Sequence, residues 1–235
     1  ATMRLGEEVS GIEPFEDERG EHVRIKLASG KQIISQKALY SVGRVGATAT
    51  LGLENTDVKT DSRGRVTVNE NYQTESPKIY AVGDVIGFPS LASTSMEQGR
   101  LATCHAFGVD AESVPELFPY GIYTVPEIST VGKNEEELTE AGVAYEVGRA
   151  AFNEIARGQI TGDSTGLLKI LFDPDTRKLL GVHILGEGAC DLIHIGQAVM
   201  AMGGTMDYFI NTVFNYPTLA ESYKTAAFDG INRLG

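Results

Sequence analysis

Asp84 is a carboxylate placed where an α/β sheet could use it to bind a ligand. It follows the apolar run 79–82 and Gly83 within the segment TESPKIYAVGDVIGFPSLA. The run predicts a buried strand, and the small residues from Ser90 onward predict the start of a helix. Ligands bind beyond the carboxyl ends of strands in such sheets, so Asp84 could accept a hydrogen bond from a sugar-like hydroxyl. The alternative is that Asp84 only caps a turn, which an isolated Gly-Asp would favour.

The segment FNYPTLAE places an aromatic side chain close to an acid near the C-terminus. Thr218 and Glu221 have capping-box spacing, and a helix cap alone would explain Glu221. It does not explain Tyr216, which precedes Pro217 at the start of a predicted helix. An aromatic–proline bond is also a reasonable position for a cis peptide. Tyr216 and Glu221 are therefore both candidate catalytic residues.

Composition limits the classes of protein to which the chain can belong. Its 235 residues suffice for one large or two modest domains of ordinary globular composition. The formal net charge of −12 argues against a surface for nucleic acid or anionic membrane. No apolar stretch approaches membrane-spanning length, and no charged leader precedes an apolar core. We therefore expect a cytoplasmic protein.

Cysteine and histidine are too scattered to indicate a redox pair or a metal site. Cys104 and Cys190 lie far apart, each in a helical pattern with small or apolar neighbours, which indicates two buried thiols. His183 lies in a strand pattern and His194 in an amphipathic helix, where packing or solvent exposure is expected rather than catalysis. We expect no bound metal.

The N-terminal part of the chain has the pattern of a sheet. Residues 23–27 alternate apolar and polar, and residues 29 and 30 supply a turn before an apolar return, which predicts a hairpin. The apolar run 38–42 is expected to be a further strand. About forty residues without a helix cannot bury both faces of a sheet. This part is therefore expected to pack on something else, and residue 1 is not expected to begin a natural fold.

The middle of the chain predicts strands followed by one helix. Residues 61–64 are a turn signal before a strand at 66–68, and the Asp84 segment follows. A helix is expected from about 91 to 107, with Leu91, Met96 and Leu101 facing inward.

From about Val114 onward the pattern changes to that of an α+β domain. Asn134 is expected to cap a helix whose first turn is acidic, and DPDTR to join two strands in a hairpin. Strands are predicted at 121–124, 167–172 and 178–185, and helices at 189–202, 206–213 and 219–233.

Together these segments resemble the flavin-dependent pyridine nucleotide-disulfide oxidoreductase family across essentially the whole chain. VGRVGATATLGLE, YAVGD and PSLA are similar to the signature that closes the family's FAD domain. The resemblance implies that Asp84, after Gly83, accepts a hydrogen bond from the ribityl chain of FAD. It also implies that the amides around Leu91, Ala92 and Ser93 face the pyrimidine edge of the flavin.

The resemblance implies three parts of the chain and a homodimer. Residues 1–46 would be the remnant of an NAD(P)-domain sheet, 47–112 the second segment of the FAD domain, and 113–235 an α+β dimerisation domain with an antiparallel sheet and flanking helices. The expected fold class is therefore α/β together with α+β. The family's glycine-rich FAD half does not occur in the sequence, so we expect a fragment that is inactive alone and that dimerises through residues from about 113 onward.

The residue before Pro217 distinguishes among members of this family. Its disulfide reductases carry a catalytic His there and a Glu five positions later, whereas this chain has Tyr216 and keeps Glu221. A phenol, with a pKa of about 10, is poorly suited to move a thiol proton at neutral pH. The chain is thus most similar to a member that transfers hydride between NADPH and NAD through FAD without a disulfide. A dihydrolipoamide dehydrogenase-like member and a non-catalytic dimerisation module stay open as alternatives.

Overall fold

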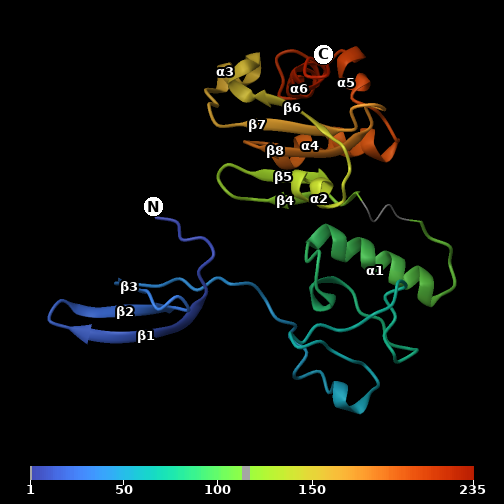
Figure 1. Cartoon of the computed structure of the whole chain (residues 1–235). Coiled ribbons are helices and arrows are strands. Elements are labelled where there is room, and N and C mark those ends of the chain that lie inside the picture. Colours follow the sequence, from blue (N-terminus) through green and yellow to red (C-terminus); the bar gives the residue numbers. More distant parts are fainter. Residues whose placement is uncertain (1, 113–116) are drawn as a thin grey trace. The chain divides into compact units, whose positions relative to one another are not determined.

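The computed structural model describes residues 2–112 and 117–235. The chain divides into two compact units, Ala1–Val45 and Gly46–Gly235. The first unit is a small sheet, and the second contains a five-stranded sheet and the described helices (Figure 1). No helix among the described residues combines the length and the apolar character needed to span a bilayer. The boundary expected at residue 113 and the change of pattern at Val114 lie outside the described residues.

The first unit is an antiparallel sheet of β1 (Val9–Asp17), β2 (Gly20–Leu27) and β3 (Gln32–Ser35), in that order. The predicted hairpin is confirmed, since Lys26 pairs with Gln32 across a turn that contains Gly30 at a φ of 83°. The strand expected at 38–42 is wrong. Leu39 is 95% exposed, and no strand among the described residues pairs with that segment. Its apolar pattern has no surface in this unit to pack against.

The segment from Gly46 to residue 112 is mostly irregular chain around one long helix. It contains the 3₁₀ turns η1 (Leu53–Asn55) and η2 (Gly83–Ile86), followed by α1 (Ala92–Ala106). The turn at 61–64 is confirmed by a 3.0 Å bond from the Gly64 N–H to the Asp61 carbonyl.

The strands expected at 66–68 and 79–82 are wrong. Each forms one isolated bridge, Thr60 with Val66 and Gln73 with Tyr80. Their other backbone groups bond to nearby turns, as in the 2.9 Å bond from the Val66 N–H to the Val85 carbonyl. Val66 is buried and residues 79–82 are half-buried, but neither run pairs continuously with another strand.

The helix expected at 91–107 is confirmed as α1, but its buried face differs from the prediction. Leu101 is buried, whereas Met96 is 71% exposed and Leu91 is half-buried. Thr94 and Gln98 are buried instead. A polar side chain inside this face indicates that the helix satisfies a backbone group of the chain packed against it.

The C-terminal sheet is antiparallel, with the strand order β4-β5-β8-β7-β6 among the described residues. Its strands are β4 (Tyr120–Ile122), β5 (Ile128–Gly132), β6 (Glu146–Ala151), β7 (Leu167–Phe172) and β8 (Leu179–Leu185). The predicted β7–β8 hairpin is confirmed, and the strand expected at 121–124 lies at 120–122. β5 and β6 were not predicted.

Helices lie on both faces of this sheet. They are α2 (Glu135–Glu140), α3 (Ala156–Thr161), α4 (Ala189–Ala201), α5 (Asp207–Asn211) and α6 (Glu221–Ile231), with a short 3₁₀ turn η4 (Phe152–Glu154) before α3. α4 packs on β5 and β8, and α6 on β6 and β7. The core between them contains Ile170, Phe172, Val182, Ile193 and Tyr223. The α+β architecture predicted for this part is confirmed.

Candidate functional site

Gly83 lies in a tight turn against α1. It is buried, with a φ of 77°, and its N–H donates a 2.7 Å hydrogen bond to Oε1 of Gln98. A Cβ at this position would lie 3.0 Å from the Ser95 hydroxyl oxygen. Only glycine adopts this conformation without strain and leaves room for the helix. Gln98 and Ser95 were not singled out from the sequence, although a polar residue on the inward face of a predicted helix is the signal that could have found Gln98.

Asp84 follows directly in the same turn, η2. Its side chain is exposed, and its backbone carbonyl accepts a 3.1 Å bond from the Gly87 N–H, which closes the turn. Because Gly83 is held to α1 beside Ser95, the backbone of the turn that carries Asp84 is fixed to that helix. The position combines a negative charge, access to solvent and a rigid support.

The N-terminus of α1 supplies hydrogen-bond donors to the same region. Leu91 is the N-cap residue, with an extended backbone and no capping side-chain bond, and Ala92 and Ser93 are exposed. The first amides of a helix have no partner within the helix and carry its positive dipole. The residues Gly83, Asp84, Leu91, Ala92 and Ser93 thus form one turn-and-helix unit, in which an acceptor and several backbone donors lie at one end.

Tyr216 and Glu221 lie at the start of α6. The Tyr216–Pro217 peptide is cis, as expected, and the Tyr216 side chain is 74% exposed. Glu221 accepts a 3.1 Å bond from the Thr218 N–H, while the Thr218 hydroxyl donates to the Asn215 carbonyl at 2.7 Å. Only the Glu221 half of the predicted capping box forms. Glu221 is therefore engaged as a helix cap, and Tyr216 projects beside it.

A cleft of about 180 Å³ lies beside Glu221 and is lined by Val213, Phe214, Glu221, Lys224 and Thr225. None of the five residues of the Asp84 turn lines it. Lys224 donates a 2.9 Å bond to the Thr212 carbonyl, which fastens the loop that leads to Tyr216 onto α6. Within one chain, the two groups of candidate residues are thus placed by different elements.

The scattered Cys and His residues do not form a site. Both cysteines are free thiols and are half-buried rather than fully buried, and burial raises the pKa of Cys190. His183 lies in β8, and burial lowers its pKa, while His194 is exposed on α4. Among the described residues, no group of three or more His, Cys, Asp or Glu side chains is arranged to hold a metal ion.

Two family models match the chain, and together they cover most of it. Residues 2–99 match the pyridine nucleotide-disulphide oxidoreductase model, and residues 118–227 match the dimerisation domain of the same oxidoreductases. The chain belongs to the pyridine nucleotide-disulphide oxidoreductase family.

Two relatives of the chain carry the same name. The chain is 52% identical over 233 residues to a soluble pyridine nucleotide transhydrogenase of Mycobacterium bovis. The matched residues make up 99% of the chain and 49% of that relative. It is also 52% identical to the protein of the same name from Pectobacterium atrosepticum, over 99% of the chain and 50% of that protein. The chain spans about half the length of the curated relatives it matches.

Two solved structures share the fold of this chain. LpdA from Mycobacterium tuberculosis superposes with a TM-score of 0.81 at 26% identity, over 97% of this chain and 48% of LpdA. The HOCl-induced flavoprotein disulfide reductase RclA from Escherichia coli gives a TM-score of 0.82 at 26% identity, over 94% of this chain and 50% of RclA.

Proposed function

We propose that this chain is part of an FAD-dependent enzyme that transfers hydride between NADPH and NAD. The observation that carries the proposal is 52% identity, over 99% of the chain, to proteins named soluble pyridine nucleotide transhydrogenase. Because the chain spans about half of their length, the activity belongs to the longer protein. In this proposal residues 1–46 belong to the NAD(P) domain, 47–112 to the FAD domain and 113–235 to the dimerisation domain.

The Asp84 turn has the donors and acceptors that FAD requires. Asp84 supplies an exposed carboxylate for a ribityl hydroxyl, and the uncapped start of α1 at Leu91, Ala92 and Ser93 supplies backbone donors for the pyrimidine edge. Gly83 keeps the turn close to the helix. When bound, FAD would accept hydride from one nucleotide and pass it to the other. The residues of this chain bind and orient the cofactor.

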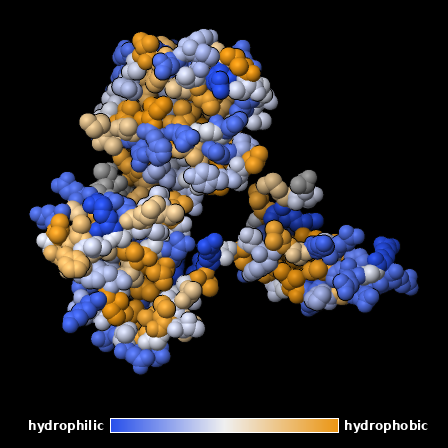
Figure 2. Space-filling view, turned by 180° about the vertical axis from the view of Figure 1, so that it is seen from behind, coloured by the Kyte–Doolittle hydropathy of each residue, from blue (hydrophilic) through white to orange (hydrophobic). Residues whose placement is uncertain are grey.

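Tyr216 and Glu221 are proposed to act near the flavin of the partner subunit of a homodimer. The exposure of Tyr216 and the helix-cap bond of Glu221 support a role in packing and positioning, without a proton transfer. Large apolar side chains are exposed in the same domain, and Figure 2 shows such residues gathered in patches on the molecular surface. They include Tyr123, Val125, Met202, Val213 and Tyr216. A second copy would cover them.

Flavin retention by an Asp84→Ala variant of the full-length protein tests this proposal. Loss of a charge-assisted hydrogen bond, worth roughly 1.5 to 3 kcal/mol, should weaken FAD binding about ten- to a hundredfold. Asp57→Ala is the control, because Asp57 is an exposed carboxylate elsewhere in the same unit. If Asp84 only closes a turn, the melting temperature should fall while flavin occupancy after dialysis stays unchanged. That second result would overturn the FAD role.

A further inference from the structure

β6 forms one edge of the five-stranded sheet within the described residues, and it pairs only with β7. In an antiparallel ladder, alternate residues of an edge strand point their N–H and C=O groups away from the neighbouring strand. In β6 these outward amides belong to Val147, Arg149 and Ala151, because all three donate to side chains instead of to β7. An exposed row of such groups is a template for pairing with another chain.

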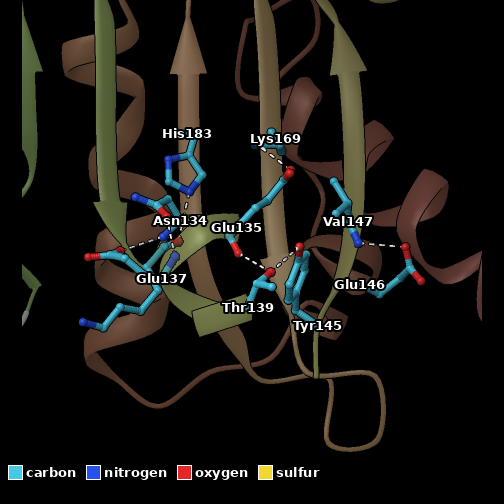
Figure 3. Close-up of polar contacts among 10 residues, drawn as sticks. Asn134, Glu135, Glu137, Thr139, Tyr145, Glu146, Val147, Lys169 and His183 are labelled. Atoms are coloured by element: carbon cyan, nitrogen blue, oxygen red, sulfur yellow. Dashed lines mark hydrogen bonds and ion pairs between the residues drawn. The ribbon is translucent and has the colours of Figure 1, made fainter. Parts of the chain in front are cut away.

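Each of the three amides donates a hydrogen bond to a different carboxylate. Val147 donates to Oε1 of Glu146, Arg149 to Oδ2 of Asp229 and Ala151 to Oε2 of Glu154, all at 2.9 Å. Figure 3 shows the first of these bonds, with the Glu146 side chain beside the backbone of the strand.

The three acids come from separate elements, so no single local motif produces the pattern. Glu146 begins β6, Glu154 ends the 3₁₀ turn η4 after it, and Asp229 is on α6. Arg233 also binds the Asp229 oxygen that accepts from the Arg149 amide, with its Nη2 3.1 Å from Oδ2. Two segments far apart in sequence thus meet along one strand edge.

The same edge borders a groove of about 480 Å³. Its lining includes Arg149, Glu154, Thr225, Asp229 and Arg233. Thr225 and Asp229 of α6, with Arg233 just after that helix, form one wall of the groove, and the outward amides of β6 face it through their carboxylate partners. The carboxylates are therefore what stands between the outward amides of β6 and an approaching strand.

We infer that these three carboxylates close the β6 edge against pairing with a strand of a second copy of the chain. An incoming strand would have to displace three charge-assisted hydrogen bonds and bring its carbonyl oxygens against three negative charges. The opposite edge, β4, is only three residues long, and short edge strands pair poorly. Strand pairing is thus disfavoured at the β4 edge because that strand is short, and at the β6 edge because of its three carboxylates. Association of this domain is left to its apolar surfaces.

The test compares two triple variants that remove the same charge. Glu146→Ala, Glu154→Ala and Asp229→Ala open the edge, whereas Glu136→Ala, Glu140→Ala and Asp175→Ala remove three exposed acids of the same domain that bond no strand amide through their side chains. Residue-resolved amide exchange should be at least about tenfold faster at residues 147, 149 and 151 in the first variant only. That variant should also form assemblies larger than the wild-type oligomer, with increased β-sheet content.

Single variants keep the test decisive if the triple variant does not fold. Glu154→Ala should accelerate exchange at Ala151 and leave Val147 unchanged, and Glu154→Gln, which keeps an acceptor oxygen, should restore protection. Equal exchange and equal oligomer size in the two triple variants would overturn the inference. So would exchange in Glu154→Ala that matches the wild type at residue 151.

Discussion

The hydroxyl of Tyr223 accepts a 3.0 Å hydrogen bond from the backbone N–H of Gly196, so a side chain of α6 joins the backbone of α4. The same hydroxyl donates to the Leu192 carbonyl at 3.0 Å. In a regular helix the N–H of residue 196 would bond that carbonyl directly. A Cβ at Gly196 would lie 2.9 Å from the phenol oxygen, so glycine is what lets Tyr223 approach.

Tyr223→Phe should destabilise this domain by about 1 to 3 kcal/mol, because it removes both hydrogen bonds that this buried hydroxyl makes to α4. Tyr223 is fully buried. Tyr208→Phe, at a half-exposed tyrosine on the neighbouring helix α5, is the matched control and should change stability by less than about 0.5 kcal/mol. Urea denaturation measures both. Equal midpoints for the two variants would mean that these two hydrogen bonds add nothing to the stability of the domain.

Two glycine-to-alanine substitutions should act in opposite directions. A Cβ at Gly148 in β6 would lie 2.1 Å from the Ala226 carbonyl oxygen of α6, so Gly148→Ala should force the helix off the strand and cost at least about 1 to 3 kcal/mol. Gly99 in α1 has open space around a Cβ, so Gly99→Ala should stabilise its helix by about 0.5 to 1 kcal/mol. Denaturation curves of both variants check the pair. A tolerated Gly148→Ala would show that α6 can shift freely.

Stability should fall on mild acidification because of His183. Burial lowers the pKa of this side chain below its ordinary value of 6.5, and Lys169 acts in the same direction. Its Nε2 lies 3.0 Å from the Lys133 carbonyl. The unfolded chain takes up a proton near pH 6.5 and the folded chain only at lower pH. The stabilisation is therefore complete above 6.5 and is lost as pH falls through the folded pKa.

Denaturation free energies of wild type and His183→Gln, measured from about pH 8 to pH 5, isolate this contribution. Glutamine can still donate to the Lys133 carbonyl but does not titrate. Glu135 and Glu137 oppose the shift of the His183 pKa, and both are retained in the variant. The wild-type curve should fall more steeply below pH 6.5 than the variant curve. Parallel curves would contradict the prediction.

Tyr216→Phe in the full-length protein should retain most hydride transfer from NADPH to NAD. The proposed reaction takes no proton from the phenol, so the loss should be that of one neutral hydrogen bond, about 0.5 to 1.5 kcal/mol. Steady-state kinetics with FAD occupancy measured in parallel provide the check. A decrease of several orders of magnitude with FAD still bound, or reduction of lipoamide by the natural protein, would assign different chemistry to the site.

Features encoded over a few residues could be predicted from the sequence. Asn134 caps α2 through the expected local contacts, with its side chain 2.8 Å from the Glu137 N–H, and DPDTR closes the expected hairpin. β6 could not be predicted, because EVGRAA has little strand propensity. It is a strand because β7 pairs with it and because Gly148 lets α6 pack on it.

In the candidate site too, residues marked by local sequence could be predicted, and those that depend on a long-range contact could not. Gly83 and Asp84 stand out because a turn signal and an acid are adjacent in sequence. Gln98, which holds that turn from inside α1, depends on a contact across 15 positions and was missed. The same contact explains why Met96, which was predicted to face inward, is exposed. The hydrogen bond of Gln98, together with apolar packing, determines which face of α1 is buried.

The pairing order of the C-terminal sheet also predicts the order in which its strands pair during folding. β7 and β8 adjoin in sequence and pair in a hairpin, whereas β5 pairs with β8, for example Ile128 with Leu185, across a long intervening segment that contains β6 and β7. Closing a short loop loses less chain entropy, so the central hairpin should nucleate and β5 should join later. Ile170→Val in β7 should then slow refolding, while Val131→Ala in β5 should mainly accelerate unfolding.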